Sequence, residues 1–170
     1  LGNNDADILK GDISIDLDKQ KIEESKEKDS SPQMRQNEDS VLPSGLKSEW
    51  MLKQDSIVKL EKILFSHGGL ALSHVKEPEE LSDEIRTAIT TKQHSPLLKQ
   101  SGPLKHDIYW TTVEDKACFE ADIVLGKMNA SRMITSHPTQ TDGKIKVRCS
   151  GRLINIDTNI SQYYGGNIAA

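Results

Sequence analysis

The stretch FEADIVL at residues 119–125 decides the fold that the sequence predicts. Apolar residues alternate there with acidic ones, Phe119, Ala121, Ile123 and Leu125 with Glu120 and Asp122. An alternation with a period of two is typical of a β-strand that has one buried and one solvent-facing side. The sequence therefore predicts a sheet in this part of the chain.

Two amphipathic helices are predicted ahead of the sheet, at about residues 48–66 and 78–93. Ser48 is a suitable N-cap for the first helix, and Gly68 fits its end because glycine adopts the left-handed conformation at low cost. Pro78 fits the first turn of the second helix. The apolar stripe of the first helix is wide, which predicts a self-association surface that includes Trp50, Met51, Val58 and Phe65.

Further strands are predicted at residues 132–135, 144–149 and 153–157. Gly151 interrupts the last two, either as a bulge in one bent strand or as a break between two strands. The predicted fold class is α+β, with two helices followed by a small antiparallel sheet of three to five strands over residues 106–158. A partly closed barrel of the OB type is the alternative arrangement of these strands.

The first 45 residues differ in composition from the rest of the chain. Residues 1–48 hold 11 Asp and Glu against 7 Lys and Arg, a difference of −4 that equals the net charge of the whole chain. Residues 19–39 have too few apolar side chains to offset the entropy of ordering the backbone. We therefore expect a disordered, acidic-leaning tail over residues 1–45 and a single α+β domain over residues 46–170.

The tail contains one short aliphatic motif at residues 12–18. Ile13, Ile15 and Leu17 alternate there with acidic residues, among them Asp16 and Asp18. A segment of this kind can add itself as a strand to the sheet edge of another protein. It resembles a SUMO-interacting motif and, less closely, the aliphatic repression motifs of plant transcription factors. The alternatives are an edge strand of the protein's own sheet and a segment without structure.

Basic residues alternate with apolar ones in the predicted strand at residues 144–149. A strand places Lys144, Lys146 and Arg148 on one face, and Arg152 follows shortly after. Such a face can bind a nucleic-acid backbone or an acidic peptide. The alternative is that Glu120 and Asp122 neutralise it from a neighbouring strand.

The sequence predicts no catalytic, metal-binding or cofactor-binding residues. None of the five histidines has the spacing of a known zinc motif: His67, His74, His94, His106 and His137. Cys118 and Cys149 are interpreted as buried free thiols of an intracellular protein, with a disulfide as the alternative. No segment has the length and apolarity of a membrane span, and we expect a nuclear or cytoplasmic location.

The function that these observations favour is that of a non-enzymatic adaptor. Its tail motif would bind one protein partner by strand addition, and its folded domain would bind a second partner. A nucleic-acid-binding module that uses the basic strand is the first alternative. A hydrolase or other enzyme without a recognisable motif is the second.

Overall fold

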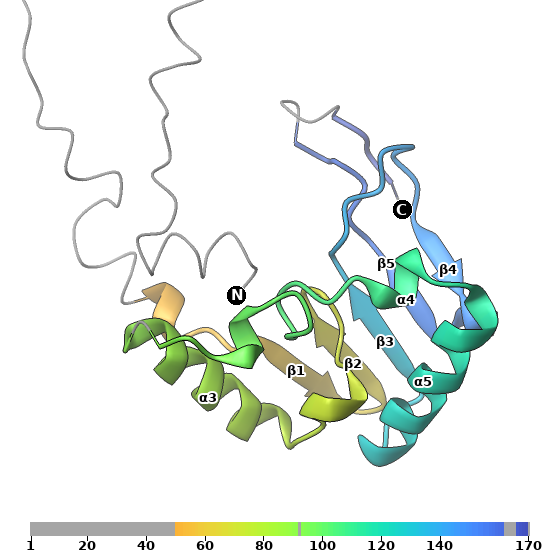
Figure 1. The fold of residues 1–170 in the computed structure, drawn as a ribbon. Helices are drawn as coiled ribbons and strands as arrows, with labels where there is room; N and C mark the ends of the chain where they lie inside the picture. Colours follow the sequence, from red (N-terminus) through yellow and green to blue (C-terminus); the bar gives the residue numbers. More distant parts are fainter. Residues whose placement is uncertain (1–49, 92, 162–165, 170) are drawn as a thin grey trace, which may run out of the picture.

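The computed structural model describes residues 50–91, 93–161 and 166–169 (Figure 1). A five-stranded sheet packs against helices, so the expected α+β class is confirmed. The strands are β1 (Ile57–Leu60), β2 (Ile63–Ser66), β3 (Arg132–Thr135), β4 (Lys146–Arg148) and β5 (Leu153–Asn155). The α-helices are α3 (Pro78–Thr90), the short α4 (Ile108–Thr111) and α5 (Glu114–Lys127). Single 3-10 turns are η1 (Leu72–His74), η2 (Pro96–Leu98) and η3 (Cys149–Gly151).

The sheet is mixed and open. Its strand order is β1-β2-β3-β5-β4, in which β2, β3 and β5 are parallel to one another and the outer strands are antiparallel to their neighbours. The predictions of an antiparallel sheet and of a partly closed OB-type barrel are therefore wrong. Parallel strands need a long crossover connection. Here the connection from β2 to β3 contains α3, α4 and α5. The alternation of apolar and polar residues within one strand does not indicate whether its neighbours are parallel or antiparallel.

The stretch at residues 119–125 forms part of helix α5, so the strand predicted there is wrong. The buried residues of α5 have helical spacing instead: Ala117, Ala121, Val124 and Leu125. Phe119, which the alternation placed on the buried side, is 70% exposed. The apolar residues of this stretch fit both periods, and packing of the helix against the sheet selects the helical one.

The helix predicted at residues 48–66 is also wrong. Only residues 50–52 of the described chain are helical in this region, and β1 and β2 form an antiparallel hairpin after them. Glu61 in the turn has a φ of 54°. Glycine and asparagine are the usual residues at such positions, and the turn contains neither, so the sequence gives no hairpin signal here. The helical surface on which self-association was predicted therefore does not form.

Other predicted elements agree with the structure. Helix α3 begins at Pro78 as expected, and β3 occupies the predicted residues 132–135. The strand predicted at residues 144–149 is shorter, since β4 includes only Lys146–Arg148. Gly151 lies in η3 between β4 and β5, so it separates two strands rather than bending one.

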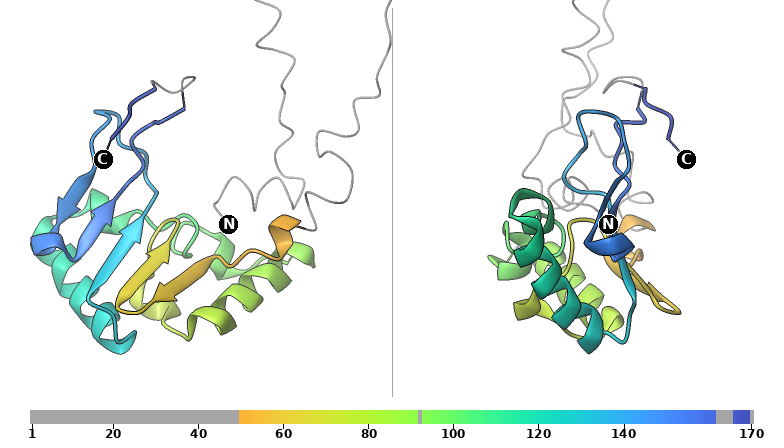
Figure 2. Two further views of the ribbon diagram at one scale, coloured as in Figure 1. Left: turned by 180° about the vertical axis from the view of Figure 1, so that it is seen from behind. Right: turned by 90° about the vertical axis from the view of Figure 1, so that its right-hand side faces the viewer.

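One face of the sheet carries the core. Figure 2 shows α3 and α5 on the same side of the sheet. Core side chains come from both helices and from the sheet: Leu64, Leu81, Ile85, Ile89, Val124, Leu125, Met133 and Leu153. Buried Tyr109 contributes its ring to this core, and its hydroxyl donates a hydrogen bond to the carbonyl of Leu70 at 2.7 Å. Burial of the phenol raises the pKa of Tyr109 far above its ordinary value.

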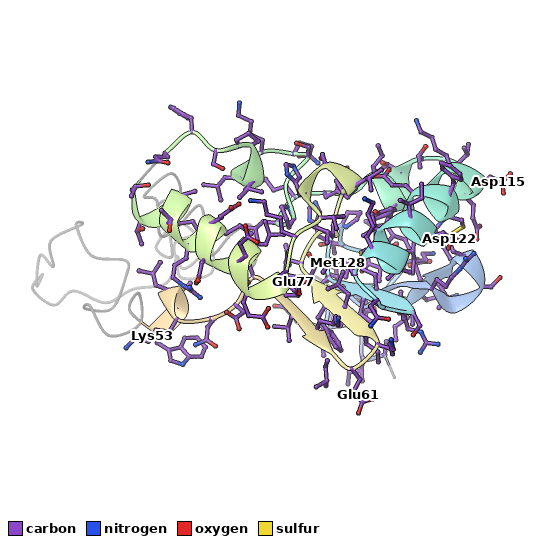
Figure 3. The ribbon with its side chains drawn as sticks, turned by 90° about the horizontal axis from the view of Figure 1, so that it is seen from below. Lys53, Glu61, Glu77, Asp115, Asp122 and Met128 are labelled. Atoms are coloured by element: carbon purple, nitrogen blue, oxygen red, sulfur yellow. A yellow bond between two sulfur atoms is a disulfide. The ribbon has the colours of Figure 1, made fainter. Side chains whose placement is uncertain are left out.

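The opposite side of the sheet, named here the open face, has no helix of the described residues over it (Figure 3). One residue from each strand lies in register across it: Val58, Phe65, Ile134, Ile154 and Val147. All five are apolar, and Val58 and Val147 are 45% and 59% exposed. The sheet therefore has two apolar faces, of which the described residues cover one.

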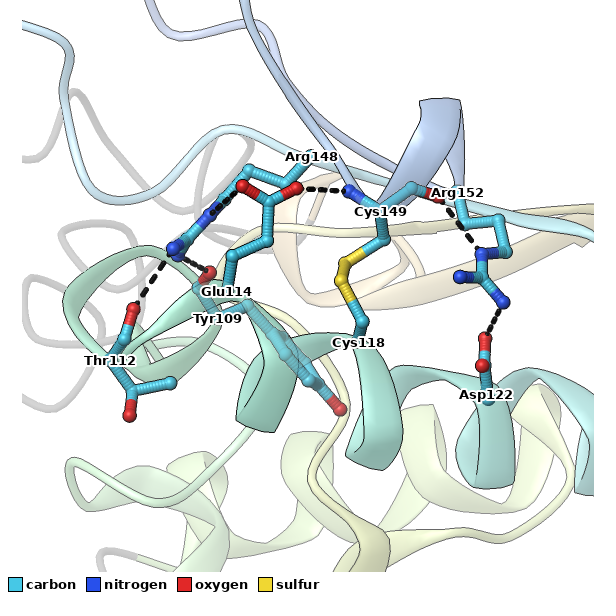
Figure 4. Close-up of a disulfide and its surroundings, with 8 residues drawn as sticks. All are labelled: Tyr109, Thr112, Glu114, Cys118, Asp122, Arg148, Cys149 and Arg152. Carbon is cyan, nitrogen blue, oxygen red and sulfur yellow. Dashed lines mark hydrogen bonds and ion pairs between the residues drawn. A yellow bond between two sulfur atoms is a disulfide. The ribbon is translucent and has the colours of Figure 1, made fainter.

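Cys118 and Cys149 form a disulfide, so the prediction of free thiols is wrong. The two Cα atoms are 5.3 Å apart, and the bond joins α5 to η3 (Figure 4). A nuclear or cytoplasmic location stays a prediction. None of the described helices is long and apolar enough to span a bilayer.

Candidate active site

Three parallel strands end side by side at one edge of the sheet. His67 follows β2, Ser136 and His137 follow β3, and Asp157 lies two residues after β5. In α/β sheets, ligands bind beyond the carboxyl ends of parallel strands because the connecting loops leave a crevice there. Polar side chains from all three strands meet at this edge, which makes it the candidate site.

His67 and His137 form a close pair at this edge. Their ring centroids are 5.5 Å apart with an angle of 33° between the planes. The hydroxyl of Ser136 hydrogen bonds to Nδ1 of His67 at 2.8 Å, which joins the end of β2 to the end of β3. A hydrogen bond at one ring nitrogen orients the imidazole and directs the other nitrogen toward its own ligand or proton acceptor.

Burial lowers the pKa of His137 below its ordinary value, because desolvation penalises the charged imidazolium. The charges of Asp107 and Asp157 oppose this shift, and the charge of Lys105 adds to it. The lowered pKa favours the neutral form of the His137 imidazole. Neutral imidazoles with carboxylates nearby favour a bound cation over a bound anion.

The loop that carries His137 is fastened to the end of β5. Thr139 donates a hydrogen bond from Oγ1 to Oδ2 of Asp157 at 2.6 Å, and the backbone N–H of Gln140 donates to the carbonyl of Asp157 at 2.8 Å. The amide of Asn155, which is fully buried, donates to the carbonyl of Pro138 at 2.7 Å. These contacts hold the loop in the position that brings His137 to His67.

Gly68 fixes the path of the chain immediately after His67. A Cβ atom at this position would lie 2.6 Å from the backbone nitrogen of His106 and 2.9 Å from the carbonyl oxygen of Pro103. The N–H of Gly68 donates to that same carbonyl at 2.8 Å. Only glycine fits so close an approach, and the contact sets where the His67 backbone leaves the sheet.

His106 lies behind this turn and is 5% exposed. Its ring packs edge-on against Tyr109, with centroids 5.0 Å apart. Nε2 of His106 is buried and has no hydrogen-bond partner. Burial lowers the pKa of His106, because the imidazolium would lose its hydration.

A shallow hollow of about 320 Å³ begins at this edge and continues onto the open face. Its lining includes the polar residues Ser66, His67 and Ser136 and the apolar residues Phe65 and Ile134. The hollow therefore brings His67 and Ser136 together with two apolar residues of the open face.

A second group of metal-ligand types lies elsewhere and cannot bind a metal in this state. Ligand atoms of Glu114, Cys118 and Cys149 lie within 4.8 Å of one another, but both sulfurs belong to the disulfide. Glu114 instead accepts a hydrogen bond from the backbone N–H of Cys149 at 2.9 Å (Figure 4). In the described ranges no other three ligand atoms come this close, so the histidine pair does not belong to a cluster of three ligand atoms.

The predicted basic surface is largely neutralised within the domain. Lys146 pairs with Asp142, and Arg152 pairs with Asp122, one of the two acids expected to do so. The guanidinium of Arg148 donates to the carbonyls of Tyr109 and Thr112 (Figure 4). Lys144 precedes β4 and lies outside the sheet. Nucleic-acid binding by this surface stays a prediction.

The tail motif lies outside the described residues. Partner binding through Ile13, Ile15, Asp16, Leu17 and Asp18 therefore stays a prediction. Replacement of the three aliphatic residues by alanine should abolish capture of the partner, and unchanged capture would contradict the prediction.

Sequence reasoning missed the histidine pair. The signal was present, because ILFSH at 63–67 and MITSH at 133–137 are both short apolar runs that end in Ser-His. The second run was recognised as a strand, whereas the first was assigned to a helix. With both assigned to parallel strands, the two histidines would have been expected at the same edge.

Comparisons with known proteins give one sequence relative and a recurring fold. No family model matches the chain. The chain is 29% identical to an uncharacterised protein of Schizosaccharomyces pombe over 126 residues, which are 74% of this chain and 33% of that protein.

The solved structures that it resembles are those of a cold-active protein tyrosine phosphatase. A point mutant of that phosphatase has a TM-score of 0.58 and 19% identity, over 69% of this chain and 37% of the phosphatase. The enzyme from a psychrophilic Shewanella species has a TM-score of 0.56 and 20% identity, over 69% and 37% of the two chains. The chain thus shares its fold with about a third of each of these longer proteins.

Proposed function

We propose that this domain is part of a phosphoester hydrolase and that His67 and His137 belong to its active site. The observation that carries the proposal is the pair of imidazoles at the carboxyl ends of neighbouring parallel strands, in a fold that resembles part of a phosphatase. The proposal takes up the hydrolase alternative of the sequence analysis and replaces the adaptor as the preferred function.

In this proposal, His67 and His137 hold a divalent metal ion. Ser136 orients His67, and burial lowers the pKa of His137, which favours the neutral imidazole that metal binding requires. The charges of Asp107 and Asp157 act on the same position and would oppose direct binding of a phosphate anion by the histidines alone. A metal ion at such a site polarises the phosphoryl oxygen and lowers the pKa of a bound water.

Equilibrium dialysis of residues 1–170 with Mn²⁺ or Zn²⁺ tests the metal site directly. Binding should weaken by about 10-fold or more when either His67→Ala or His137→Ala removes one donor. His94→Ala is a matched control because His94 is exposed and lies far along the chain from this edge. Equal binding by wild type and both site variants would contradict the metal assignment.

Hydrolysis of p-nitrophenyl phosphate and of a phosphotyrosine peptide tests the activity. The full-length Schizosaccharomyces pombe relative is the appropriate enzyme, because this chain matches only 33% of it. Alanine at its counterparts of His67 and His137 should lower kcat by about 10²-fold or more, as expected when a group that stabilises the transition state is lost. A relative that hydrolyses neither substrate with added metal, or variants with wild-type rates, would contradict the proposed function.

A further inference from the structure

The open face is a continuous apolar surface that crosses the whole sheet. Val58, Phe65, Ile134, Ile154 and Val147 follow one another from β1 to β4 in hydrogen-bonded register. Neighbouring strands are about 4.8 Å apart, so this row of five is about 19 Å wide. Contiguous apolar patches on a protein surface mark protein–protein contacts, membrane contacts or ligand-binding grooves.

The strand directions support the same conclusion. The three central strands β2, β3 and β5 are parallel, and parallel sheets are almost always covered on both faces. Helices α3 and α5 cover one face only (Figure 2). The other face carries a partly exposed phenylalanine and exposed aliphatic residues, and an apolar face of a sheet is normally buried against another element.

We propose that the open face is covered by a further layer of the same protein, formed by polypeptide that lies beyond residues 1–170. The length of the relatives supports this occupant, because the matched region is only 33% of the Schizosaccharomyces pombe protein and 37% of the phosphatase. The remaining two thirds are enough for a covering layer. Its contact surface would be aliphatic, to match the valine and isoleucine side chains of the row.

This layer would end beside the histidine pair. The hollow is lined both by His67 and Ser136 and by Phe65 and Ile134 of the open face. Whatever packs on the row therefore borders the site and can bring polar groups to it. In this last step the inference rests on the proposed function, whereas the packing itself does not depend on phosphoester hydrolysis.

Binding of 8-anilinonaphthalene-1-sulfonate tests whether the face is exposed in residues 1–170. The dye should bind the monomeric chain, and the triple variant Val58→Thr, Val147→Thr and Ile154→Thr should lower its fluorescence on the order of fivefold. Phe119→Ser is the matched control, since this side chain is 70% exposed but lies on α5. Dye fluorescence that the triple variant leaves unchanged would overturn the proposal.

Two measurements identify the occupant. Light scattering should find a monomer; a dimer that the triple variant dissociates would mean that a second copy covers the face. Removal of residues 1–49 should leave dye binding unchanged, and a rise would mean that the tail is the cover. Either of these results would overturn the proposal.

The relative supplies the decisive comparison. The full-length Schizosaccharomyces pombe protein should bind little dye, and the same protein trimmed to its matched region should bind on the order of fivefold more. Equal binding by both forms would overturn the proposal. An inactive full-length relative that still gains dye binding on trimming would contradict the proposed function and leave the covering layer supported.

Discussion

The two faces of the sheet are built from adjacent residues of the same strands, yet they have opposite surroundings. Leu64, Met133 and Leu153 point to the helices and are completely buried. Phe65, Ile134 and Ile154, one residue further along each strand, belong to the open face and are only partly buried. The comparison teaches that apolarity alone did not decide burial here. The presence of α3 and α5 on one side did.

The largest expected loss of stability comes from a substitution on the helix-covered face, compared with one on the open face. Leu64→Ala should lower the free energy of unfolding of residues 1–170 by about 2–5 kcal/mol, because it leaves a cavity under the helices. Phe65→Ala should cost clearly less, since its ring is partly exposed. Urea denaturation measures both. Equal losses would show that the open face is covered in this chain.

The disulfide should contribute the next largest effect. Cys118 and Cys149 are separated by 31 residues, and a loop of this size corresponds to about 3–4 kcal/mol of unfolded-state entropy. The double variant Cys118→Ser, Cys149→Ser should therefore lose about this much free energy of unfolding. Wild type treated with dithiothreitol is the control and should behave in the same way. A double variant as stable as the oxidised wild type would show that the bond does not form.

His106 makes the covered side sensitive to pH. Its pKa is lowered in the folded state, chiefly by burial, from the value of 6.5 that applies when it is unfolded. The unfolded chain therefore binds a proton first as the pH falls, so stability is greatest above pH 6.5 and decreases as the pH falls toward the lower folded pKa.

The variant His106→Gln should make the free energy of unfolding depend less on pH between about 7 and 5. Urea denaturation across this range measures the slope. His94→Gln, at an exposed position, serves as the control and should keep the wild-type slope. A His106 variant with the wild-type slope would refute the assignment of this pH dependence to burial.

The smallest effect is expected from an exposed ion pair. Arg152 and Asp122 have side chains that are 41% and 47% exposed, and such pairs contribute about 0–1 kcal/mol. Asp122→Asn should therefore change the free energy of unfolding by no more than about 1 kcal/mol, with a smaller change at high salt. A larger loss of free energy of unfolding would mean that the ion pair contributes substantially to the packing of α5 against the sheet.

The sequence predicted those elements whose signals are local. Pro78 and the two glutamates after it predict the start of α3 (Pro78–Thr90), and the short apolar run at residues 132–135 predicts β3. It failed at α5 and at the β1–β2 hairpin, where apolar residues fit two periods at once. Ala121 and Leu125 satisfy the helical and the alternating pattern equally, so only contact with the sheet selects one.

The candidate site could not be predicted from local sequence patterns either, because its residues come from separate parts of the chain. His67 and His137 are far apart in the sequence, and the Ser-His ends of their two runs do not show that the runs pair as parallel strands. Their proximity requires parallel pairing of β2 and β3, which depends on a crossover through three helices. The basic residues and Asp122 as a neutralising partner were visible in the sequence, but the fold decided that Asp122 pairs with Arg152 from a helix rather than from a neighbouring strand.

By itself, the sequence determined the α+β class, helix α3 and strand β3, because hydrophobic spacing and helix-end residues act over a few positions. Only the tertiary structure decided that residues 119–125 form a helix, that the central strands run parallel, and that Cys118 meets Cys149. Burial depends on which surfaces pack together across the whole chain, and the local spacing of apolar residues does not determine that packing.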